Sequence, residues 1–210
     1  CRDEKFRNQH TGGWCSGFMV GPDVIATAGH CVRTEARAKE TAFIFGFYVR
    51  NSGDSGTKTF QANQVYFGKE LIARKENTSV GDFSIVRVDR SITAPGATPL
   101  SIRRNGRITP GAQVGVIGYP SGLPVKIAFG AQTIFMREEG PWLIANLDTY
   151  KGNSGSAVFN SDGLVEGILS EGATDFNLDD ENSCFRSVRI DDDEGREKVT
   201  KASNFIDLIP

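Results

Sequence analysis

The sequence predicts an all-β fold, and three observations lead to that prediction. Its apolar stretches are short and rich in Val, Ile and Phe, which is the composition of strands rather than of long helices. Turn-forming residues, among them many of the 24 glycines, separate these stretches at regular intervals. The three- and four-residue spacing of an amphipathic helix occurs in one place, at the C-terminal end.

The first half of the chain holds a series of predicted strands. They are bounded by turn-forming residues such as Gly21-Pro22-Asp23 and the Gly- and Ser-rich stretch 51–56. The strands are expected over residues 14–20, 23–27, 41–50, 59–67, 69–74 and 83–89. Short strands at this spacing are typical of a barrel or a sandwich.

A segment with little periodicity separates the two halves. Residues 91–111 are rich in Pro, Gly, Arg and Thr, so we expect a connector there. We place the domain boundary inside it, which gives an N-terminal domain of residues 1–98 and a C-terminal domain of residues 99–210.

The second half repeats the pattern of short strands and ends in the predicted helix. Strands are expected over residues 113–119, 125–137, 142–148, 156–159 and 164–170. Within residues 195–209 apolar side chains recur at three- and four-residue intervals and Pro210 follows, which predicts a C-terminal α-helix packed on a barrel. The apolar residues of this predicted helix are Val199, Ala202, Phe205, Ile206 and Ile209.

Charge and hydropathy argue against two classes of partner. The 24 Lys and Arg nearly balance the 26 Asp and Glu, so the net charge is −2 and the chain lacks the basic character of a nucleic-acid-binding protein. The longest strongly apolar run, residues 41–49, is too short to span a bilayer. We therefore expect neither nucleic-acid binding nor membrane insertion.

The four cysteines indicate an oxidising compartment. Their number is even, and they follow neither the zinc-binding nor the redox CxxC spacing. The residues alone leave three disulfide connectivities open. We expect a secreted or periplasmic protein that needs no metal and no cofactor.

One segment has a strongly biased charge. Residues 171–194 hold nine acidic residues and two Arg, which is the composition of a solvated loop. The acidic residues at its end offer oxygen ligands of the kind that Ca²⁺ takes, but their spacing is not that of a calcium loop. These residues are Asp191, Asp192, Asp193 and Glu194. We expect no metal site here.

His30 is one of only two histidines, and its context is informative. It follows an apolar strand in the stretch Ala-Thr-Ala-Gly-His-Cys at 26–31. The small residues before it let the backbone approach a neighbouring segment closely, and Cys31 offers a covalent anchor for the loop. An imidazole fixed in this way is suited to act as a general base.

Ser154 and Asp82 complete a candidate catalytic set with His30. Ser154 lies in the stretch Lys-Gly-Asn-Ser-Gly-Ser at 151–156, where a tight turn would aim the backbone N–H groups of Gly152 and Ser154 at one point, as an oxyanion hole requires. Asp82 stands just ahead of an apolar strand. Its carboxylate would hold the tautomer of His30 in which Nε2 accepts a proton from Ser154.

With these motifs in the order His, Asp, Ser, the sequence resembles the trypsin-like (chymotrypsin-fold) serine endopeptidases. The stretches that carry the resemblance are 15–32, 81–88 and 147–160, and the stretches 165–172 and 199–209 are similar to the same family. The GNSGS form of the nucleophile motif looks more similar to bacterial members, such as the glutamyl endopeptidases, than to trypsin. The resemblance implies two antiparallel six-stranded β-barrels with the catalytic cleft between them.

The resemblance also implies disulfides, substrates and a mode of action. Cys15 and Cys31 match the bridge that braces the histidine loop in this family, which leaves Cys1 to pair with Cys184. The substrates would be polypeptides, hydrolysed through an acyl-enzyme by a monomer. Asn153 stands where trypsin has the Asp that receives the new N-terminus, so activation by N-terminal insertion is not expected. The alternative is a protease-like binding module without turnover, although such relatives usually lose a member of the triad.

Residues near Ser154 point to two different specificities. Asp148 lies six residues before Ser154, where trypsin-like enzymes have the floor of the primary (S1) pocket and a carboxylate selects Arg or Lys. Thr149 and the GNSGS motif are instead shared with glutamyl endopeptidases, but those enzymes use a histidine where this chain has Leu169. The other residues expected to bind substrate are Ser170 and Gly172. We expect cleavage after Arg or Lys, with cleavage after Glu as the alternative.

Overall fold

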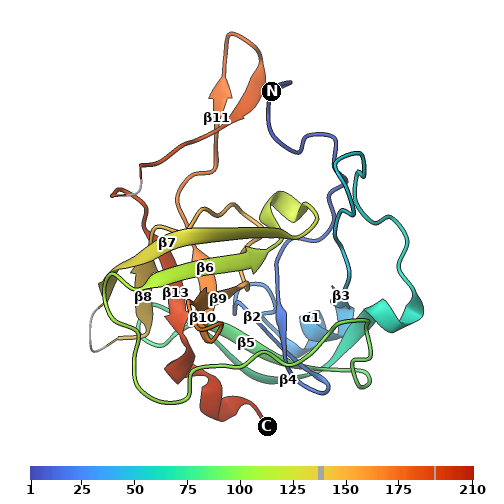
Figure 1. The fold of residues 1–210 in the computed structure, drawn as a ribbon. Coiled ribbons are helices and arrows are strands. Elements are labelled where there is room, and N and C mark those ends of the chain that lie inside the picture. Colours follow the sequence, from blue (N-terminus) through green and yellow to red (C-terminus); the bar gives the residue numbers. More distant parts are fainter. Residues whose placement is uncertain (137–139, 192) are drawn as a thin grey trace.

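The computed structural model describes residues 1–136, 140–191 and 193–210 (Figure 1). It contains thirteen strands, one short α-helix and four 3₁₀ turns within those residues, which confirms the all-β prediction. Arg137, the last residue of one expected strand, lies outside the described residues. The helix α1 (Glu35–Glu40) begins at Thr34, whose side chain caps the backbone N–H of Arg37.

The N-terminal half forms a five-stranded antiparallel sheet in the order β1-β2-β5-β4-β3. Its strands are β1 (Phe18–Gly21), β2 (Val24–Thr27), β3 (Ala42–Ile44), β4 (Val65–Asn77) and β5 (Gly81–Val88). The long strand β4 follows the 3₁₀ turn η1 (Ala62–Gln64) and unites parts of the two strands expected over 59–67 and 69–74.

This sheet is open, whereas we expected a closed six-stranded barrel. The strand expected over 41–50 is only three residues long, because the chain leaves the sheet soon after Phe45 donates its backbone N–H to the Gln64 carbonyl at 2.8 Å. The next residue, Gly46, has a φ of 84°, a left-handed conformation that glycine adopts readily and that is incompatible with a regular strand.

The C-terminal half closes into a six-stranded barrel in the order β10-β13-β8-β7-β6-β9. Its strands are β6 (Gln113–Gly118), β7 (Lys126–Met136), β8 (Trp142–Ala145), β9 (Ala157–Asn160), β10 (Val165–Glu171) and β13 (Glu197–Lys201). The connector that joins the two halves runs from the end of β5 to the start of β6, and the boundary we predict between residues 98 and 99 falls inside it. A further 3₁₀ turn, η2 (Pro120–Gly122), follows β6.

The α-helix expected over residues 195–209 does not form. The segment instead consists of β13 and the 3₁₀ turns η3 (Ala202–Asn204) and η4 (Ile206–Leu208). Val199 is fully buried, and it pairs with Leu143 of β8 and Leu169 of β10. The apolar residues that have helical spacing therefore belong to a strand and to the 3₁₀ turns of three residues each that follow it.

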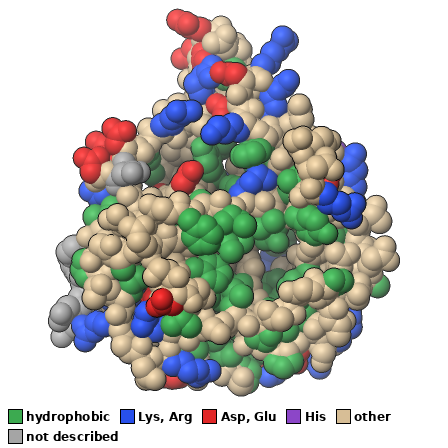
Figure 2. All heavy atoms as spheres, in the orientation of Figure 1, with side chains coloured by type: hydrophobic (Ala, Val, Ile, Leu, Met, Phe, Trp, Pro, Cys, Tyr) green, Lys and Arg blue, Asp and Glu red, His purple; other side chains and the backbone are tan. Residues whose placement is uncertain are grey.

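A hairpin missing from the sequence-based prediction projects from the barrel beside the N-terminus (Figure 1). It consists of β11 (Phe176–Asp179) and β12 (Cys184–Ser187). The Cys1–Cys184 disulfide ties the N-terminus to it, and Arg186 forms an ion pair with Asp3 at 2.8 Å. Figure 2 shows acidic and basic side chains over this projection and hydrophobic side chains over the middle of the same face.

The main core cluster joins the two halves. It includes buried residues of β2 and β5 together with residues of β10 and of the C-terminal turns. Phe83 of β5 packs against Phe205 of the C-terminal segment, with ring centroids 5.9 Å apart, and both side chains are almost completely buried. This contact anchors the start of β5 directly beside Asp82.

Within the described residues, no helix has both the length and the apolar composition needed to cross a membrane.

Candidate active site

Sheet register brings His30 and Asp82 together. β2 pairs with β5 so that Thr27 lies opposite Ser84. His30 follows three residues after Thr27, and Asp82 precedes Ser84 by two, so both lie at the same end of the sheet. The His30 ring Nδ1 lies 2.7 Å from Asp82 Oδ2. The imidazole is partly exposed, while the carboxylate is buried.

The backbone of the histidine loop binds the same carboxylate a second time. The backbone N–H of His30 donates to Asp82 Oδ1 at 2.9 Å, so each carboxylate oxygen has its own donor. Gly29 makes this approach possible, because a Cβ at that position would overlap the Lys75 carbonyl and lie 2.8 Å from Asp82 Oδ1. The close approach inferred from the small residues before His30 is therefore present.

β13 and β10 hold the backbone of Asp82 from the other side. The Asp82 N–H donates to Thr200 Oγ1 at 2.9 Å, and Ser170 Oγ lies 3.1 Å from the same hydroxyl oxygen. Ser170 Oγ is also 3.4 Å from the Asp82 carbonyl. Thr200 was not identified from the sequence, because its strand lies in the segment expected to be helical.

The nucleophile loop depends on two glycines with positive φ. Gly152 has a φ of 100° and Gly155 a φ of 90°. A Cβ on Gly152 would lie 2.6 Å from the Tyr119 carbonyl oxygen, and one on Gly155 would overlap Ser16 and Thr27. Both positions are therefore restricted to glycine by conformation and by space.

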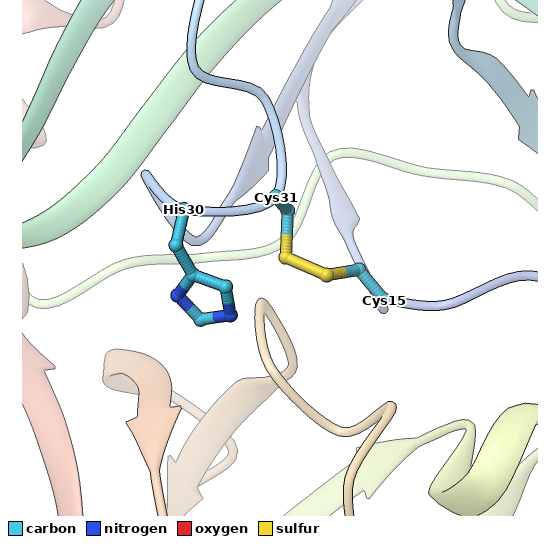
Figure 3. Close-up of side chains that lie close together, drawn as sticks. All are labelled: Cys15, His30 and Cys31. Carbon is cyan, nitrogen blue, oxygen red and sulfur yellow. A yellow bond between two sulfur atoms is a disulfide. The ribbon is translucent and has the colours of Figure 1, made fainter.

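Ser16 links this loop to the N-terminal half. Its N–H donates to the Ser154 carbonyl at 2.8 Å, and its hydroxyl donates to the Gly152 carbonyl at 2.8 Å. The neighbouring Cys15 is bonded to Cys31, which directly follows His30. Figure 3 shows this disulfide beside the imidazole. The bridge thus couples the segment that binds the nucleophile loop to the segment that carries the histidine.

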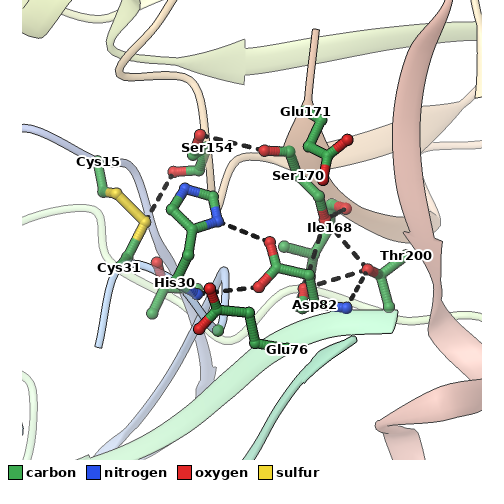
Figure 4. A network of polar contacts seen from close by, with 12 residues as sticks. Cys15, His30, Cys31, Glu76, Asp82, Ser154, Ile168, Ser170, Glu171 and Thr200 are labelled. Carbon is green, nitrogen blue, oxygen red and sulfur yellow. Dashed lines mark hydrogen bonds and ion pairs between the residues drawn. A yellow bond between two sulfur atoms is a disulfide. The ribbon is translucent and has the colours of Figure 1, made fainter. Parts of the chain in front are cut away.

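Ser154 lies on the side of the imidazole away from Asp82 (Figure 4). Its hydroxyl donates to the Ser170 carbonyl at 3.3 Å and makes no hydrogen bond to His30 in this conformation. The backbone N–H groups of Gly152 and Ser154 have no acceptor among the described residues. Both donors are therefore unpaired among the described residues, which is a precondition for the expected oxyanion hole.

A cavity of ≈ 240 Å³ opens beside Ser154. Three of the residues expected to bind substrate line it, namely Thr149, Ser170 and Gly172, and Leu169 lies beside them in the lining. The other lining residues are Tyr150, Lys151, Glu171, Ala173, Asp175 and Glu197. The lining thus includes three carboxylates and one cationic side chain.

Asp148 does not line this cavity, contrary to our expectation. Its side chain is exposed, whereas Leu143, Ala145 and Leu147 are buried. Burial alternates along this segment with the period of a strand, and Asp148 falls on the outward phase. Its distance from Ser154 in the sequence was therefore a poor guide to the direction of its side chain.

The buried carboxylate of the cavity belongs to Glu197, which was not identified from the sequence. Glu197 is only 6% exposed. It accepts a hydrogen bond from Thr149 Oγ1 at 3.0 Å and a longer one from the Ala173 N–H at 3.4 Å. Burial raises the pKa of Glu197 above its ordinary value, and the nearby carboxylates of Asp175 and Asp148 raise it further, against the lowering effect of the two hydrogen bonds.

The raised pKa of Glu197 predicts a pH-dependent cost to stability. Because the folded state holds this proton more tightly than the unfolded state, stability falls as pH rises from about 4.5 through the pKa of the folded state. Glu197→Gln removes the cost, so its Tm is expected to equal or exceed that of the parent at pH 8, with the advantage shrinking toward pH 4.5. Thermal melts across this range measure the difference, with Asp207→Asn as a control, because Asp207 is an exposed carboxylate outside the cavity. A Tm deficit of Glu197→Gln that is the same at every pH would contradict the prediction.

Two groups of potential metal ligands occur among the described residues, and both depend on disulfide sulfurs. One group contains Cys15, His30 and Cys31, and the other contains Cys1, Asp179 and Cys184. All four sulfurs are bonded to one another in pairs, so they offer no thiolate to a metal. In the acidic run at 191–194, Asp192 lies outside the described residues and the other three side chains are exposed.

Comparison with known proteins identifies the family. A family model described as a trypsin-like peptidase domain matches residues 15–168, well over half of the chain. Among solved structures, a Glu endopeptidase in complex with MPD is similar with a TM-score of 0.61 and 20% identity, over 96% of this chain and 86% of that one.

The Rv3671c protease of M. tuberculosis is also similar in two states. Its active form matches with a TM-score of 0.55 and 20% identity, over 92% of this chain and 70% of that one. Its inactive form matches with a TM-score of 0.53 and 20% identity, over 92% of this chain and 83% of that one. These likenesses establish a chymotrypsin-like fold, here with one closed six-stranded barrel and one open sheet. Together with the family match, they show that the chain belongs to the trypsin-like peptidase family and is a serine endopeptidase.

Proposed function

We propose that His30, Asp82 and Ser154 form the catalytic triad with which this endopeptidase hydrolyses peptide bonds. The observation that carries the proposal is the 2.7 Å contact between His30 Nδ1 and Asp82, with Ser154 on the opposite side of the ring (Figure 4). Asp82 holds the proton on Nδ1, which leaves Nε2 free to take the proton of the Ser154 hydroxyl. A rotation about the Cα–Cβ bond of Ser154 brings that hydroxyl from the Ser170 carbonyl to the ring.

The reaction then follows the two-step course of acyl transfer. Ser154 Oγ attacks the scissile carbonyl, and the N–H groups of Gly152 and Ser154 stabilise the oxyanion of the tetrahedral intermediate. His30 returns its proton to the departing amine, which leaves an acyl-enzyme on Ser154. Water, deprotonated by His30, hydrolyses this ester and restores the free enzyme.

We propose that the residue before the cleaved bond is Arg or Lys. Carboxylates outnumber cations at the cavity beside Ser154: Glu171, Asp175 and Glu197 line it with the exposed Lys151, and Lys198, outside the lining, pairs with Glu171. A cavity with this balance attracts a cation and repels a carboxylate. The structural likeness to a Glu endopeptidase and the presence of Thr149 favour cleavage after Glu as the second candidate.

A fluorophosphonate probe distinguishes an active triad from an inert, protease-like binding module. It is expected to form a covalent adduct on Ser154, since only an activated serine next to an oxyanion hole reacts rapidly. Peptide mapping by mass spectrometry locates the adduct, and Ser154→Ala is expected to abolish it. Folded parent protein that stays unlabelled would favour the binding module.

We further propose that the protein is a monomer outside the cytoplasm and that its substrates are polypeptides. Two disulfides support a location in an oxidising compartment. We also propose a division into domains of residues 1–98 and 99–210, because the five-stranded sheet lies within the first range and the six-stranded barrel within the second.

A further inference from the structure

The carboxylate of Glu197 is buried without a cation. Its hydrogen-bond donors are Thr149 Oγ1 and the Ala173 N–H, and it forms no ion pair within the part of the chain that the structure describes. A carboxylate removed from water has room for more donors than these two and is costly to leave uncompensated. Among the residues that the structure describes, this buried acidic group therefore has no cationic partner.

That group faces the cavity next to Ser154. Glu197 lines the cavity from β13, and Ser154 lines the same cavity. Gly172 leaves the space that the carboxylate occupies, because a Cβ on Gly172 would overlap both the carboxyl carbon and Oε2 of Glu197. A side chain that enters the cavity from a substrate bound at Ser154 thus meets Glu197 among the lining groups.

We infer that Glu197, and not Asp148, is the residue that selects Arg or Lys before the cleaved bond. The inference rests on the proposed triad, since it assumes that the cavity receives a side chain of the substrate. A substrate guanidinium or ammonium would supply the missing cation of Glu197 and form a charge-assisted hydrogen bond in a partly dry pocket. Thr149 acts as a positioning residue that holds one carboxylate oxygen.

The charges around Glu197 favour a cation over an anion. Asp148 and Asp175 both act on Glu197 as like charges, and Asp175 is itself held by the backbone N–H of Lys151 at 2.7 Å. Glu171 is already paired with Lys198 at 2.7 Å. Lys151 is the cationic residue among those that line the cavity, and its side chain is exposed. Only a protonated Glu197 carboxyl would accommodate a substrate carboxylate, and that form is favoured at low pH.

The test measures kcat/KM for four peptides that differ only in the residue before the cleaved bond, which is Arg, Lys, Leu or Glu. For Glu197→Gln, the ratio of Arg to Leu cleavage is expected to fall roughly 100-fold, as for the loss of one partner of a buried charge pair. Leu cleavage should change by less than about threefold. Asp148→Asn is the matched comparison, because it removes an acidic charge that acts on Glu197 only from outside the cavity, so the ratio should fall far less than in Glu197→Gln, by about threefold or less.

A conservative variant and a pH series separate charge recognition from a structural effect. Glu197→Asp keeps the charge and should retain a higher Arg to Leu ratio than Glu197→Gln. In the parent, that ratio should rise with pH as Glu197 ionises and then level off, and the rise should be absent in Glu197→Gln. Any pH effect on the catalytic step itself is common to both peptides, so it cancels in the ratio.

A binding measurement keeps this inference distinct from the proposed function. Benzamidine, an aryl amidinium, should raise the Tm of Ser154→Ala in a pH-dependent way and should fail to do so when Glu197→Gln is added. Binding without any turnover by the parent would contradict the triad but not Glu197. An unchanged Arg to Leu ratio in Glu197→Gln would overturn the inference, and so would a parent enzyme that prefers the Glu peptide at pH 8. A preference for the Glu peptide that is confined to acidic pH would support the inference, because it requires a protonated Glu197.

Discussion

Ser154→Ala and His30→Ala are each expected to lower kcat by roughly 10⁴-fold or more, the largest effects of any substitutions in this chain. Ser154→Ala removes the atom that forms the acyl-enzyme. His30→Ala removes the group that lies between Ser154 and Asp82 and takes the serine proton (Figure 4). Initial rates of peptide hydrolysis measure the loss. His10→Ala, at the exposed second histidine, is the matched control and should retain parental rates.

The double variant distinguishes a shared mechanism from two independent contributions. Because Ser154 and His30 act in one proton transfer, the double variant should be hardly slower than either single variant. The slow hydrolysis that remains comes from the oxyanion hole and substrate binding. Two losses that multiply would rule out the triad assignment, provided that thermal melts show each variant folded.

Asp82→Asn is expected to reduce kcat by about 10⁴-fold while leaving the fold intact. The geometry gives the reason. Oδ1 accepts the backbone N–H of His30, so the oxygen of the new amide is drawn to that position. The amide NH₂ then replaces Oδ2, 2.7 Å from Nδ1, and forces Nδ1 to accept a hydrogen bond. The ring proton moves to Nε2, and the histidine can no longer take the proton of Ser154.

Activity and stability together test this explanation. Kinetics of Asp82→Asn should show the loss in kcat, and the Tm should stay close to that of the parent, because the backbone bonds from Asp82 to Thr200 remain. NMR of the imidazole nitrogens should detect the change of tautomer. An Asp82→Asn variant that keeps its activity within tenfold would mean that Asp82 does not set the tautomer. Asp148→Asn is again the control for loss of a carboxylate.

Local patterns in the sequence were sufficient for most strands and for the candidate triad. Apolar runs bounded by turn residues correspond to β2, β5, β6 and β10, because strand formation there depends on burial that the run itself displays. His30, Asp82 and Ser154 stand out through their immediate neighbours. The structure places all three in one site, and the disulfides Cys15–Cys31 and Cys1–Cys184 agree with the pairing that the family resemblance implies.

Predictions failed where a pattern fits two structures equally well. Val199, Ala202 and Phe205 follow helical spacing, yet Val199 belongs to a strand and the other two to 3₁₀ turns or their ends. This error concealed Glu197 and Thr200, since both lie on β13. β13 contains a single apolar side chain, Val199, so no alternation of apolar and polar residues indicated a strand, and the longer helical pattern prevailed.

The sequence by itself was enough to predict the all-β class, to single out the three candidate catalytic residues and to indicate that the cysteines form disulfides. Only the tertiary structure decided which acidic groups line the cavity beside Ser154 and which of them is buried. Asp148 is close to the serine along the chain but points outward, whereas Glu197 is distant in sequence and buried in the cavity wall. The physical reason is that side-chain direction follows strand phase, while proximity follows the register of strands paired across the barrel, and neither is contained in a short stretch of sequence.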